Sequence, residues 1–458
     1  MKNHIKILFI IFAFSLLTFA LMPAILNSTP ASTAVGNWYQ QFMPNIGSRS
    51  ITDIFFLDSL TGYAVTNKST TDTMFVLKTS NSGDNWTIHF RKVQTGGGTP
   101  GYNRVYFLNQ DTGYACYTLG FDKTINGGAN WTPLRTGESF QDMSVLNNDN
   151  IWIVSANPLT GGVFFTSTGG TNWVQQYSAG SQNPEKIYMY NARIGFISDN
   201  SGSPSIRKTT NGGLNWNLNV SGQYYRDIIF TDSLTGWYSY GNNVYKTTNG
   251  GTNWQLQVLP YGGNLISVGI NEFSAINKDT LLAIGAEIIT GMQSRGIIYR
   301  TVNGGVNWTF QIPDTSIYVP GPYNYIQFTD KNHGWAYTLG FYGGIHTTTG
   351  GDPVWITAFE QISTEIPKEF KLFQNHPNPF NPNTKIKFQL TKRSYAEITI
   401  YDITGRRIQK LLNDELNAGE YEIDFNASGL SSGTYFYKLT VTTGKEEFTE
   451  TKKMILIK

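Results

Sequence analysis

Short runs of alternating hydrophobic and polar residues recur along the chain, and each run ends in a turn. The clearest copies read "IFFLDSLTGYAV", "VYFLNQDTGYAC", "IIFTDSLTGWYSY" and "IQFTDKNHGWAYT". A period-two segment leads to an Asp/Asn-rich turn and then to Gly and an aromatic residue, which predicts a hairpin of two β-strands. Looser copies are "MSVLNNDNIWIV", "IYMYNARIGFIS" and "AINKDTLLAIG", so seven units carry the pattern.

A second motif follows each hairpin and consists of Thr, a Gly-Gly turn and Trp. The clearest copy is "TTNGGTNW", and a degenerate seventh copy reads "TTTGGDPVW". Each unit therefore has four strands, with the Gly-Gly turn between the third strand and a fourth strand that begins at the Trp. The Trp residues lie 38 to 54 residues apart, which predicts a propeller of seven four-stranded blades. They are Trp86, Trp131, Trp173, Trp216, Trp254, Trp308 and Trp355.

Two segments compete to complete the last blade. A ring of blades usually closes with strands from both ends of the chain, because an open ring would leave unpaired strand edges. The segment "GNWYQQF" at residues 36–42 has the pattern of an isolated fourth strand, and "VWITAFEQI" at residues 354–362 is its rival. We expect the N-terminal segment to close the ring.

The repeated Gly-Gly turn has two interpretations. Asn, Thr and glycine amides can cradle an anion or calcium. Alternatively, Asn accepts backbone hydrogen bonds, the glycines adopt positive φ, and Trp folds over the turn. Repetition favours the structural interpretation, since every unit needs the same staple to stack on its neighbours.

These repeats resemble a known family. Thr, then Asn-Gly-Gly, then Asn-Trp is similar to the Asp-box, or bacterial neuraminidase (BNR) repeat, of sialidase-like propellers, and the pattern resembles propellers related to the photosystem II assembly factor. In these copies Asn mostly occupies the position of the Asp that gives the Asp-box its name. The resemblance implies an all-β, seven-bladed propeller over residues 36–362, with these turns on the rim away from the ligand face.

The ligand face of a propeller surrounds its central channel, so the residues at the start of each first strand are candidates for binding. They form a polar ring of mixed sign that suits a saccharide or a peptide, and an ordinary solvated funnel is the alternative. Tyrosines in the long loops are further candidates for stacking on a sugar: Tyr102, Tyr261, Tyr318 and Tyr323. The channel-mouth candidates are Asp53, Arg104, Asp142, Lys186, Arg226, Asp227, Glu272 and Tyr325.

Two functions remain open for the propeller. We expect a non-catalytic binding or adhesion module whose ligand is a polysaccharide or a surface protein. The alternative is a sialidase-like glycoside hydrolase that uses channel-mouth carboxylates, since glycosidases place two carboxylates across the scissile bond. The arginines do not form the arginine motif of the sialidase family, which weakens the case for sialidase activity. The five histidines show no ligand spacing, so we expect no metal and no cofactor.

The last ninety residues change in character. After a linker at residues 363–369, alternating runs separated by turns predict a small immunoglobulin-like β-sandwich over residues 370–458. The motifs "LFQNHPNPFNP", "ITIYDITGRRI", "LNAGEYEIDFNASGLSSGTYFYKL" and "KKMILIK" are similar to the type A C-terminal sorting domain of the type IX (Por) secretion system. A plain accessory sandwich is the alternative. The residues that carry the resemblance include Asn375, Pro377, Asn378, Pro379, Phe380, Gly405, Gly433 and Lys453.

That resemblance implies recognition by the outer-membrane translocon and its processing machinery, and a secreted or cell-surface location. The N-terminus agrees, because Lys2 and Lys6 precede an apolar run and small residues, which predicts a signal peptide over residues 1–34. An uncleaved membrane anchor is the alternative. The single cysteine, Cys116, excludes a disulfide framework within the chain. A net charge of +2 without a basic face gives no support for nucleic-acid binding.

Overall fold

The computed structural model describes most of the chain from Trp38 to Lys458. The predicted signal peptide lies outside the described residues. No helix in the described part of the chain is long and apolar enough to cross a membrane. The residues beyond Trp38 that are not described are 68–72, 94–100, 158, 179–183, 201–202, 258, 261–264, 268, 291–292, 314–316, 318–320, 340–342, 352–354, 364–365, 417, 428–429 and 445.

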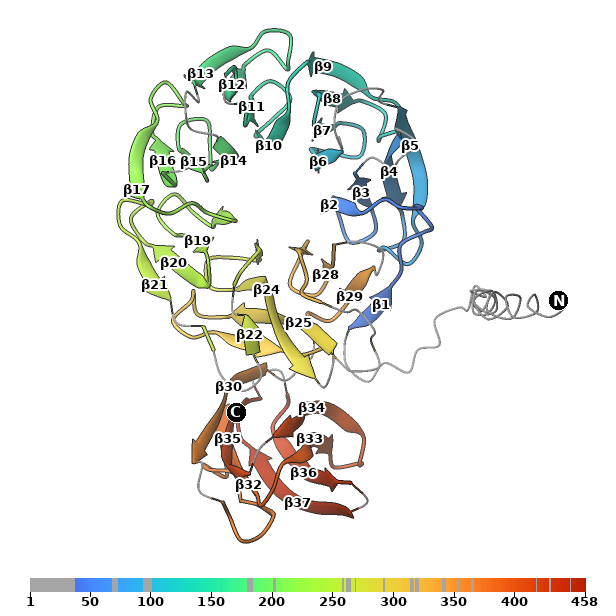
Figure 1. The fold of residues 1–458 in the computed structure, drawn as a ribbon, viewed down its shortest axis with the longest axis vertical. Helices are drawn as coiled ribbons and strands as arrows, with labels where there is room; N and C mark the ends of the chain where they lie inside the picture. Colours follow the sequence, from blue (N-terminus) through green and yellow to red (C-terminus); the bar gives the residue numbers. More distant parts are fainter. Residues whose placement is uncertain are drawn as a thin grey trace, which may run out of the picture. The chain divides into compact units, whose positions relative to one another are not determined.

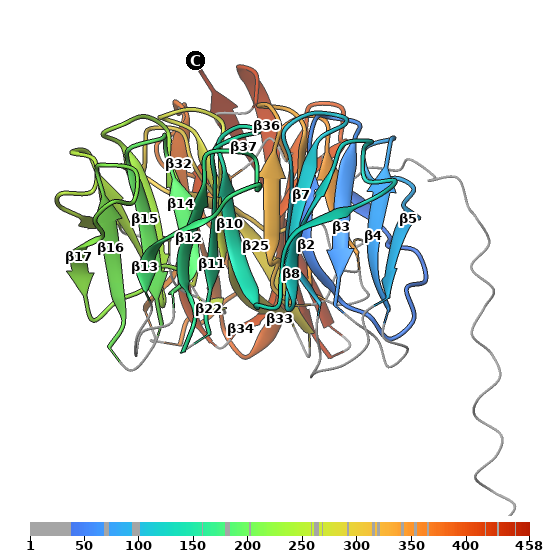
Figure 2. The same ribbon diagram turned by 90° about the horizontal axis from the view of Figure 1, so that it is seen from above.

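Antiparallel β-blades stand in a ring around a common axis (Figure 1), and their strands run between the two faces of the ring (Figure 2). The described residues form seven such blades, as the repeats predict. Within each of the first five blades the first strand is innermost, and the next strands follow outward in chain order (Figure 1). The fold is therefore an all-β propeller.

The first four blades are regular. Blade one contains β2 (Ile51–Phe56), β3 (Gly62–Thr66), β4 (Thr73–Thr79) and β5 (Thr87–Val93). Blade two contains β6 (Tyr102–Phe107), β7 (Gly113–Tyr117), β8 (Gly120–Thr124) and β9 (Thr132–Thr136). Blade three contains β10 (Phe140–Val145), β11 (Ile151–Ser155), β12 (Gly162–Thr166) and β13 (Val174–Ser178). Blade four contains β14 (Pro184–Met189), β15 (Gly195–Asp199), β16 (Ser205–Thr209) and β17 (Asn217–Ser221).

The last three blades complete the ring. Blade five contains β18 (Ile228–Phe230), β19 (Gly236–Tyr240), β20 (Asn243–Thr247) and β21 (Gln255–Gln257). In blade six, two short strands pair with the same long strand; it contains β22 (Leu265–Ser267), β23 (Glu272–Ala275), β24 (Leu281–Thr290), β25 (Gln293–Thr301) and β26 (Thr309–Gln311). Blade seven contains β27 (Tyr325–Phe328), β28 (Gly334–Tyr337), β29 (Gly344–Thr347) and β1 (Tyr39–Gln41).

The N-terminal strand closes the ring, as predicted. β1 pairs antiparallel with β29, with Tyr39 opposite His346. Trp38 lies directly before β1 and packs against Gly351 of the seventh Gly-Gly turn, the place that Trp254 takes beside Gly251 in blade five. The prediction that Trp355 is the tryptophan of the seventh Gly-Gly turn is therefore wrong.

Trp355 instead starts β30 (Trp355–Ser363), which continues away from blade seven. β30 pairs with β26 through one residue pair and with β35 (Gly419–Asn426) through seven. The sequence could not distinguish these roles, because the fourth strand of blade seven is supplied from the other end of the chain. The linker predicted at residues 363–369 thus begins at the last residue of β30. This strand pairs with β26 of blade six and with β35 of the C-terminal segment.

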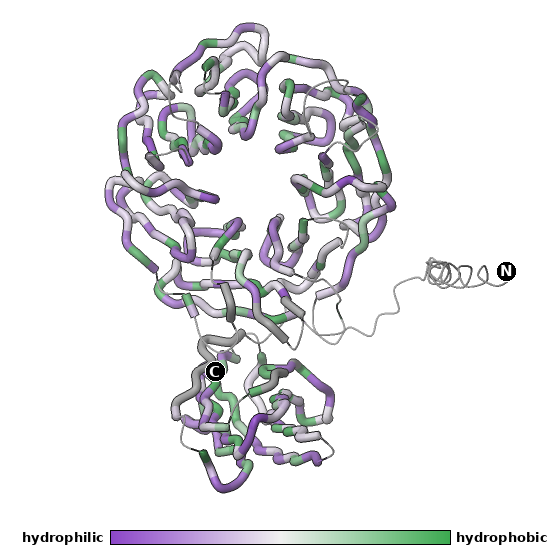
Figure 3. Tube along the Cα trace, viewed as in Figure 1, coloured by the Kyte–Doolittle hydropathy of each residue, from purple (hydrophilic) through white to green (hydrophobic). Residues whose placement is uncertain are grey.

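Aromatic stacking fills the space between neighbouring blades. Phe56 of blade one stacks on Trp335 of blade seven, with ring centroids 3.8 Å apart, and Tyr63 stacks on Phe107 of blade two at 3.5 Å. Figure 3 shows hydrophobic and hydrophilic residues alternating along the blades. Because the second strands, such as β3, β7 and β11, are buried along their whole length, neighbouring blades share a core on either side of them.

The C-terminal segment forms two packed antiparallel sheets, consistent with the predicted immunoglobulin-like sandwich. Alternate residues of β35 are buried, so one face of this sheet contributes to the sandwich core. One sheet contains β31 (Lys371–Leu372), β32 (Asn383–Leu390), β35 and β30. The other contains β34 (Arg407–Leu416), β33 (Ser394–Asp402), β36 (Gly433–Thr443) and β37 (Glu446–Leu456).

Candidate functional site

The candidate ligand-binding residues form a ring around the propeller axis, apart from Arg226. One residue at the start of the innermost strand of each blade contributes, and we call this set the inner ring. In the first four blades a β-bulge lies directly before the ring residue, and a bulge redirects the side chain beside it. The inner ring consists of Asp53, Arg104, Asp142, Lys186, Asp227, Glu272 and Tyr325.

The four carboxylates of the inner ring each hold the next blade. In every case an oxygen accepts a hydrogen bond from a backbone N–H at the inner strand of the following blade, an edge that no further strand covers. The bonds are Asp53 Oδ2 to Val105 N at 2.8 Å, Asp142 Oδ2 to Ile187 N at 3.0 Å, Asp227 Oδ2 to Phe273 N at 2.7 Å and Glu272 Oε2 to Ile326 N at 2.8 Å. These carboxylates therefore brace the ring.

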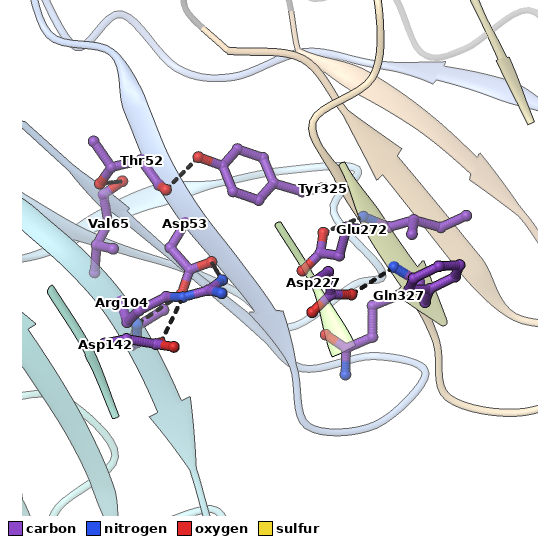
Figure 4. Close-up of polar contacts among 12 residues, drawn as sticks. Thr52, Asp53, Val65, Arg104, Asp142, Asp227, Glu272, Tyr325 and Gln327 are labelled. Carbon is purple, nitrogen blue, oxygen red and sulfur yellow. Dashed lines mark hydrogen bonds and ion pairs between the residues drawn. The ribbon is translucent and has the colours of Figure 1, made fainter. Parts of the chain in front are cut away.

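Arg104 links two of the bracing carboxylates. Its Nη1 lies 3.2 Å from Asp53 Oδ1, and its Nε lies 3.0 Å from Asp142 Oδ1. Figure 4 shows this ion network and, apart from it, Asp227 and Glu272 close to each other. Both oxygens of Asp53 and of Asp142 thus make contacts with neighbouring blades.

The three remaining candidates differ in the hydrogen bonds that their side chains make. The hydroxyl of Tyr325 donates to the carbonyl of Thr52 in blade one, which ties the last blade to the first (Figure 4). The exposed Arg226 donates from Nη1 to Asn271 Oδ1 at 2.9 Å. Lys186 is half-buried, and within the described residues its ammonium group makes no hydrogen bond or ion pair.

Burial changes the titration of the inner ring. Burial raises the pKa of Asp53, with Arg104 opposing the change, and burial also raises the pKa of Asp227. Burial and then the nearby Asp227 raise the pKa of Glu272 to about 8. Burial disfavours the charged form of Arg104, but Asp142 and Asp53 outweigh this effect and raise its pKa. Burial and the charge of Asp227 therefore keep Glu272 protonated to a higher pH than an ordinary glutamate.

A second layer of braces lies two residues further along the inner strands, and the sequence analysis missed it. Side chains at this position again reach a backbone group of the next blade. The bonds are Ser144 Oγ to Met189 N at 2.9 Å, Tyr188 OH to Phe230 N at 3.1 Å, Ser274 Oγ to Phe328 N at 2.8 Å, and Gln327 Oε1 to Phe56 N at 2.7 Å. The only sequence signal is the period of two from the inner ring, because the position holds Ser in two of these blades and Tyr or Gln in the others.

The Gly-Gly turns use their polar groups internally. In the turn of blade five, Thr247 Oγ1 accepts from Gly251 N at 2.8 Å, and Asn249 Oδ1 accepts from Asn253 N at 2.9 Å. Gly250 and Gly251 have φ of +67° and +82°, which only glycine adopts without strain. The turns lie at the opposite ends of the strands from the inner ring, since the inner strand starts at one face and the third strand ends at the other.

The Gly-Gly turns also join neighbouring blades, which the sequence analysis did not predict. Asn219 of blade four donates from Nδ2 to Gly251 O at 2.7 Å and accepts from Trp254 Nε1 at 3.1 Å. The residue three positions after the tryptophan of a Gly-Gly turn supplies this contact, and a polar residue recurs at that position in most blades. Equivalent contacts are His89 with Gly127 O at 3.1 Å, Gln176 with Gly212 O at 2.9 Å and Gln41 with Ser82 O at 2.7 Å.

Two tyrosines proposed for stacking on a ligand are buried. Tyr102 has no exposed surface and Tyr323 has 2%. Both rings fill the core, so the prediction that they stack on a sugar is wrong. Tyr261 and Tyr318 lie outside the described residues.

The residues of the sorting motif form a braced loop. Asn375 is buried and donates from Nδ2 to Pro377 O at 3.0 Å and to Thr384 Oγ1 at 2.9 Å. Phe380 is also buried, whereas Pro377 and Pro379 are exposed. The loop therefore presents its prolines on a fixed frame.

The same loop lies beside the C-terminal strand. Asn378 Oδ1 accepts from Ile455 N at 2.9 Å, and its Nδ2 donates to the carbonyl of Lys453 at 3.4 Å. The side chain of Lys453 is exposed. Gly405 has φ of +81° in the tight turn after β33, and Gly433 begins β36. The separated sequence motifs thus meet in one small domain.

Comparison with known proteins defines the class of this chain. Residues 375–458 match the family of secretion system C-terminal sorting domains. This domain marks a protein that interacts with the type IX secretion machinery and is secreted to the cell surface or the extracellular space. The chain is therefore an exported β-propeller protein with a C-terminal sorting domain. No curated protein matches the chain.

Solved structures share the propeller fold at low sequence identity. A structure of YCF48 bound to D1 peptide is 17% identical, with a TM-score of 0.50, and the match covers 68% of this chain and 97% of that one. YCF48 from Cyanidioschyzon merolae is 16% identical, with a TM-score of 0.49 and coverage of 68% and 98%. PorZ of Porphyromonas gingivalis, a surface component of the type IX secretion system, is 13% identical, with a TM-score of 0.45 and coverage of 88% and 59%.

Proposed function

We propose that the propeller is a non-catalytic binding or adhesion module that the sorting domain delivers to the outside of the cell. The observation that carries this proposal is the engagement of the inner-ring carboxylates with the backbone of the next blade. Asp53 and Asp142 have both oxygens occupied. A rigid ring surrounded by variable loops suits recognition, because binding residues are commonly placed on loops held by a rigid scaffold.

One observation favours a hydrolase as the second candidate. Glu272 has a pKa of about 8 and lies beside Asp227, so it holds a proton near neutral pH, as a general acid must. Its Oε2 nevertheless accepts from Ile326 N, and Asp227 Oδ2 accepts from Phe273 N. The pair therefore also has the contacts of a structural brace.

Glycan arrays and chromogenic glycosides, applied to the purified chain, separate the two candidates. We expect a retained saccharide or peptide ligand and no turnover. Turnover that disappears in both Glu272→Gln and Asp227→Asn, with unchanged melting temperature, would refute the non-catalytic role. The D1 peptide bound to YCF48 makes a peptide array the natural third arm.

We also propose the finer processing steps. A signal peptide over residues 1–34 directs export to the periplasm, and the translocon then recognises the sorting domain, which is removed after export. The exposed prolines of the braced loop and the exposed Lys453 support a surface for this recognition. Mass spectrometry of the extracellular form reads both ends of the mature chain, and intact ends would contradict the processing steps.

A further inference from the structure

β30 lies between the propeller and the sorting domain in the chain, but it pairs mainly with the sorting domain. One residue pair joins it to β26 of blade six. Seven residue pairs join it to β35, from Trp355 opposite Asn426 to Ser363 opposite Glu420. The family match begins at residue 375, so β30 covers the edge of β35 from outside the matched residues.

The link from β30 to the propeller is covalent and short. Gly351 belongs to the Gly-Gly turn of blade seven, and β30 begins at Trp355, which allows a span of about 14 Å at most. The strand reads "WITAFEQIS" and carries a single charged residue, Glu360. Without β35 it would be an open strand edge with little charge to protect it, which natural proteins avoid.

An exposed segment follows β30. Ile366 is 72% exposed, Lys368 and Glu369 are exposed, and residues 366–370 belong to no strand. Proteases cut preferentially in exposed segments of this kind. Hydrolysis of one peptide bond here adds water across the bond and leaves a carboxyl end after β30 and an amine end before β31. β30 then stays in the propeller fragment, whereas β35 stays in the sorting fragment.

We propose that a cut within residues 366–369 does not by itself release the sorting domain, because β30 stays paired with β35 and joins the two fragments. One backbone hydrogen bond contributes little, but the fragments separate only when the whole ladder of seven residue pairs opens. The cut propeller thus keeps the sorting domain as a noncovalent partner, held by strand pairing. This inference rests on the proposed removal of the sorting domain and distinguishes cutting from release.

A specific cut in the purified full chain tests the strand link. Pro367→Glu, Lys368→Gly and Glu369→Arg together create the sequence Ile-Glu-Gly-Arg, which factor Xa recognises. Denaturing electrophoresis confirms the cut, and size-exclusion chromatography in native buffer reads the association. We expect both fragments to elute together at the volume of the uncut chain. Separate elution would overturn the proposal.

Two variants of the cleavable chain assign the link to β30. Successive residues of a strand direct their N–H groups to opposite edges, so Phe359→Pro with Glu360→Pro removes one donor to β35. We expect the fragments of this variant to separate after the cut. Phe359→Tyr with Glu360→Gln is the matched control, since it keeps both N–H groups and should leave the fragments together. Joint elution of the proline variant's fragments would show that another contact holds them.

Amide hydrogen exchange on the cleavable chain, without the prolines, gives an answer that does not depend on the folding of the proline variant. The amides of β30 should keep after the cut the protection that they have before it, and loss of that protection would overturn the proposal. The purified chain is cut whether or not cells cut it, so failure of the strand link leaves the proposed processing and binding function standing. Intact ends of the extracellular form would refute the processing and leave the strand link standing.

Discussion

Oδ2 of Asp53 accepts a hydrogen bond from the backbone N–H of Val105, 2.8 Å away in the next blade. The same carboxylate pairs through Oδ1 with Arg104. One side chain thus satisfies a backbone group at an open strand edge and a buried cation. Both partners lose their bond when the carboxylate is removed.

Asp53→Ala should therefore destabilise the propeller by about 2–4 kcal/mol, because it leaves the Val105 N–H without its acceptor and removes one of the two carboxylates that pair with Arg104. Urea unfolding followed by tryptophan fluorescence measures the loss. Asp111→Asn is the control, since Asp111 is exposed in the turn of blade two and should change stability by less than about 0.5 kcal/mol. Equal stability of the two variants would show that the brace contributes nothing.

The inner ring was predictable as a set of positions but not as a set of contacts. Seven hairpins in one register identified equivalent residues such as Asp53 and Glu272, because the repeat fixes which residue starts each inner strand. The sequence could not show that the acceptor of each bond is a side chain and the donor a backbone amide. Backbone groups carry no residue identity, so no pattern of letters marks Val105 or Ile326 as partners.

Glu272 should make stability fall as the pH rises. Its folded pKa of about 8 lies above the reference value of 4.5, so its stabilising contribution is complete below about 4.5 and is lost as the pH rises through about 8. Glu272→Gln removes this dependence while keeping an oxygen for Ile326 N. Between pH 5 and 8.5 we expect the wild type to lose about 2–5 kcal/mol relative to the variant, a range that reflects the mutual influence of Glu272 and Asp227 on their titration.

Urea unfolding at several pH values measures this difference. Glu185→Gln is the matched control, because Glu185 is half-buried on the inner strand of blade four. Its curve should follow that of the wild type. Parallel curves for the wild type and Glu272→Gln would contradict the shifted titration.

His346 should make the pairing of β1 with β29, which closes the ring, sensitive to acid. It stacks on Trp335 at 4.8 Å and lies opposite Tyr39 of β1. Burial lowers its pKa from 6.5 to about 4, so its contribution to stability is present above about 6.5 and is lost as the pH falls through about 4. We expect the wild type to lose at most about 3 kcal/mol between pH 7 and 4 relative to His346→Phe.

Thermal melts across this pH range test this sensitivity. His376→Gln is the control, since His376 is exposed in the C-terminal segment and should leave the pH dependence as it is in the wild type. If His346→Phe loses stability with acid as steeply as the wild type, another group is responsible.

Trp38 should contribute as much to the stability of the propeller as the tryptophans of the other Gly-Gly turns. Trp38→Ala removes a buried indole whose Nε1 donates to Gln311 Oε1 at 3.0 Å, and should cost about 3–5 kcal/mol, the same range expected for Trp254→Ala. Tyr39→Ala, at an exposed neighbour, should cost less than about 1 kcal/mol. Urea unfolding compares the three variants. A small effect of Trp38→Ala would mean that the ring closes without the N-terminal strand.

The repeats predicted the fold almost completely, and the failures arose where the repeat is broken. The Gly-Gly turn of blade seven ends in Trp355 along the chain but in Trp38 in space. Linear spacing cannot reveal this exchange, because a ring closure joins residues about 300 positions apart, as the bond between Trp38 and Gln311 illustrates. Burial of Tyr102 and Tyr323 was likewise hidden, since a tyrosine at the start of a strand has the same sequence pattern whether it faces the core or a ligand.

Deletion of Phe370 to Lys458 should stop the propeller from reaching the outside of the cell, because the deletion removes the sorting domain that the type IX machinery recognises. Phe380→Ala should reduce export by disturbing the same domain, since Phe380 is buried and its N–H donates to Ile455 O at 2.9 Å. Ile366→Ala, at a side chain that is 72% exposed before the domain, should leave export unchanged. Immunoblots of culture medium and of protease-treated intact cells read the location. Continued surface exposure of the deleted form would show that the propeller reaches the surface by another route.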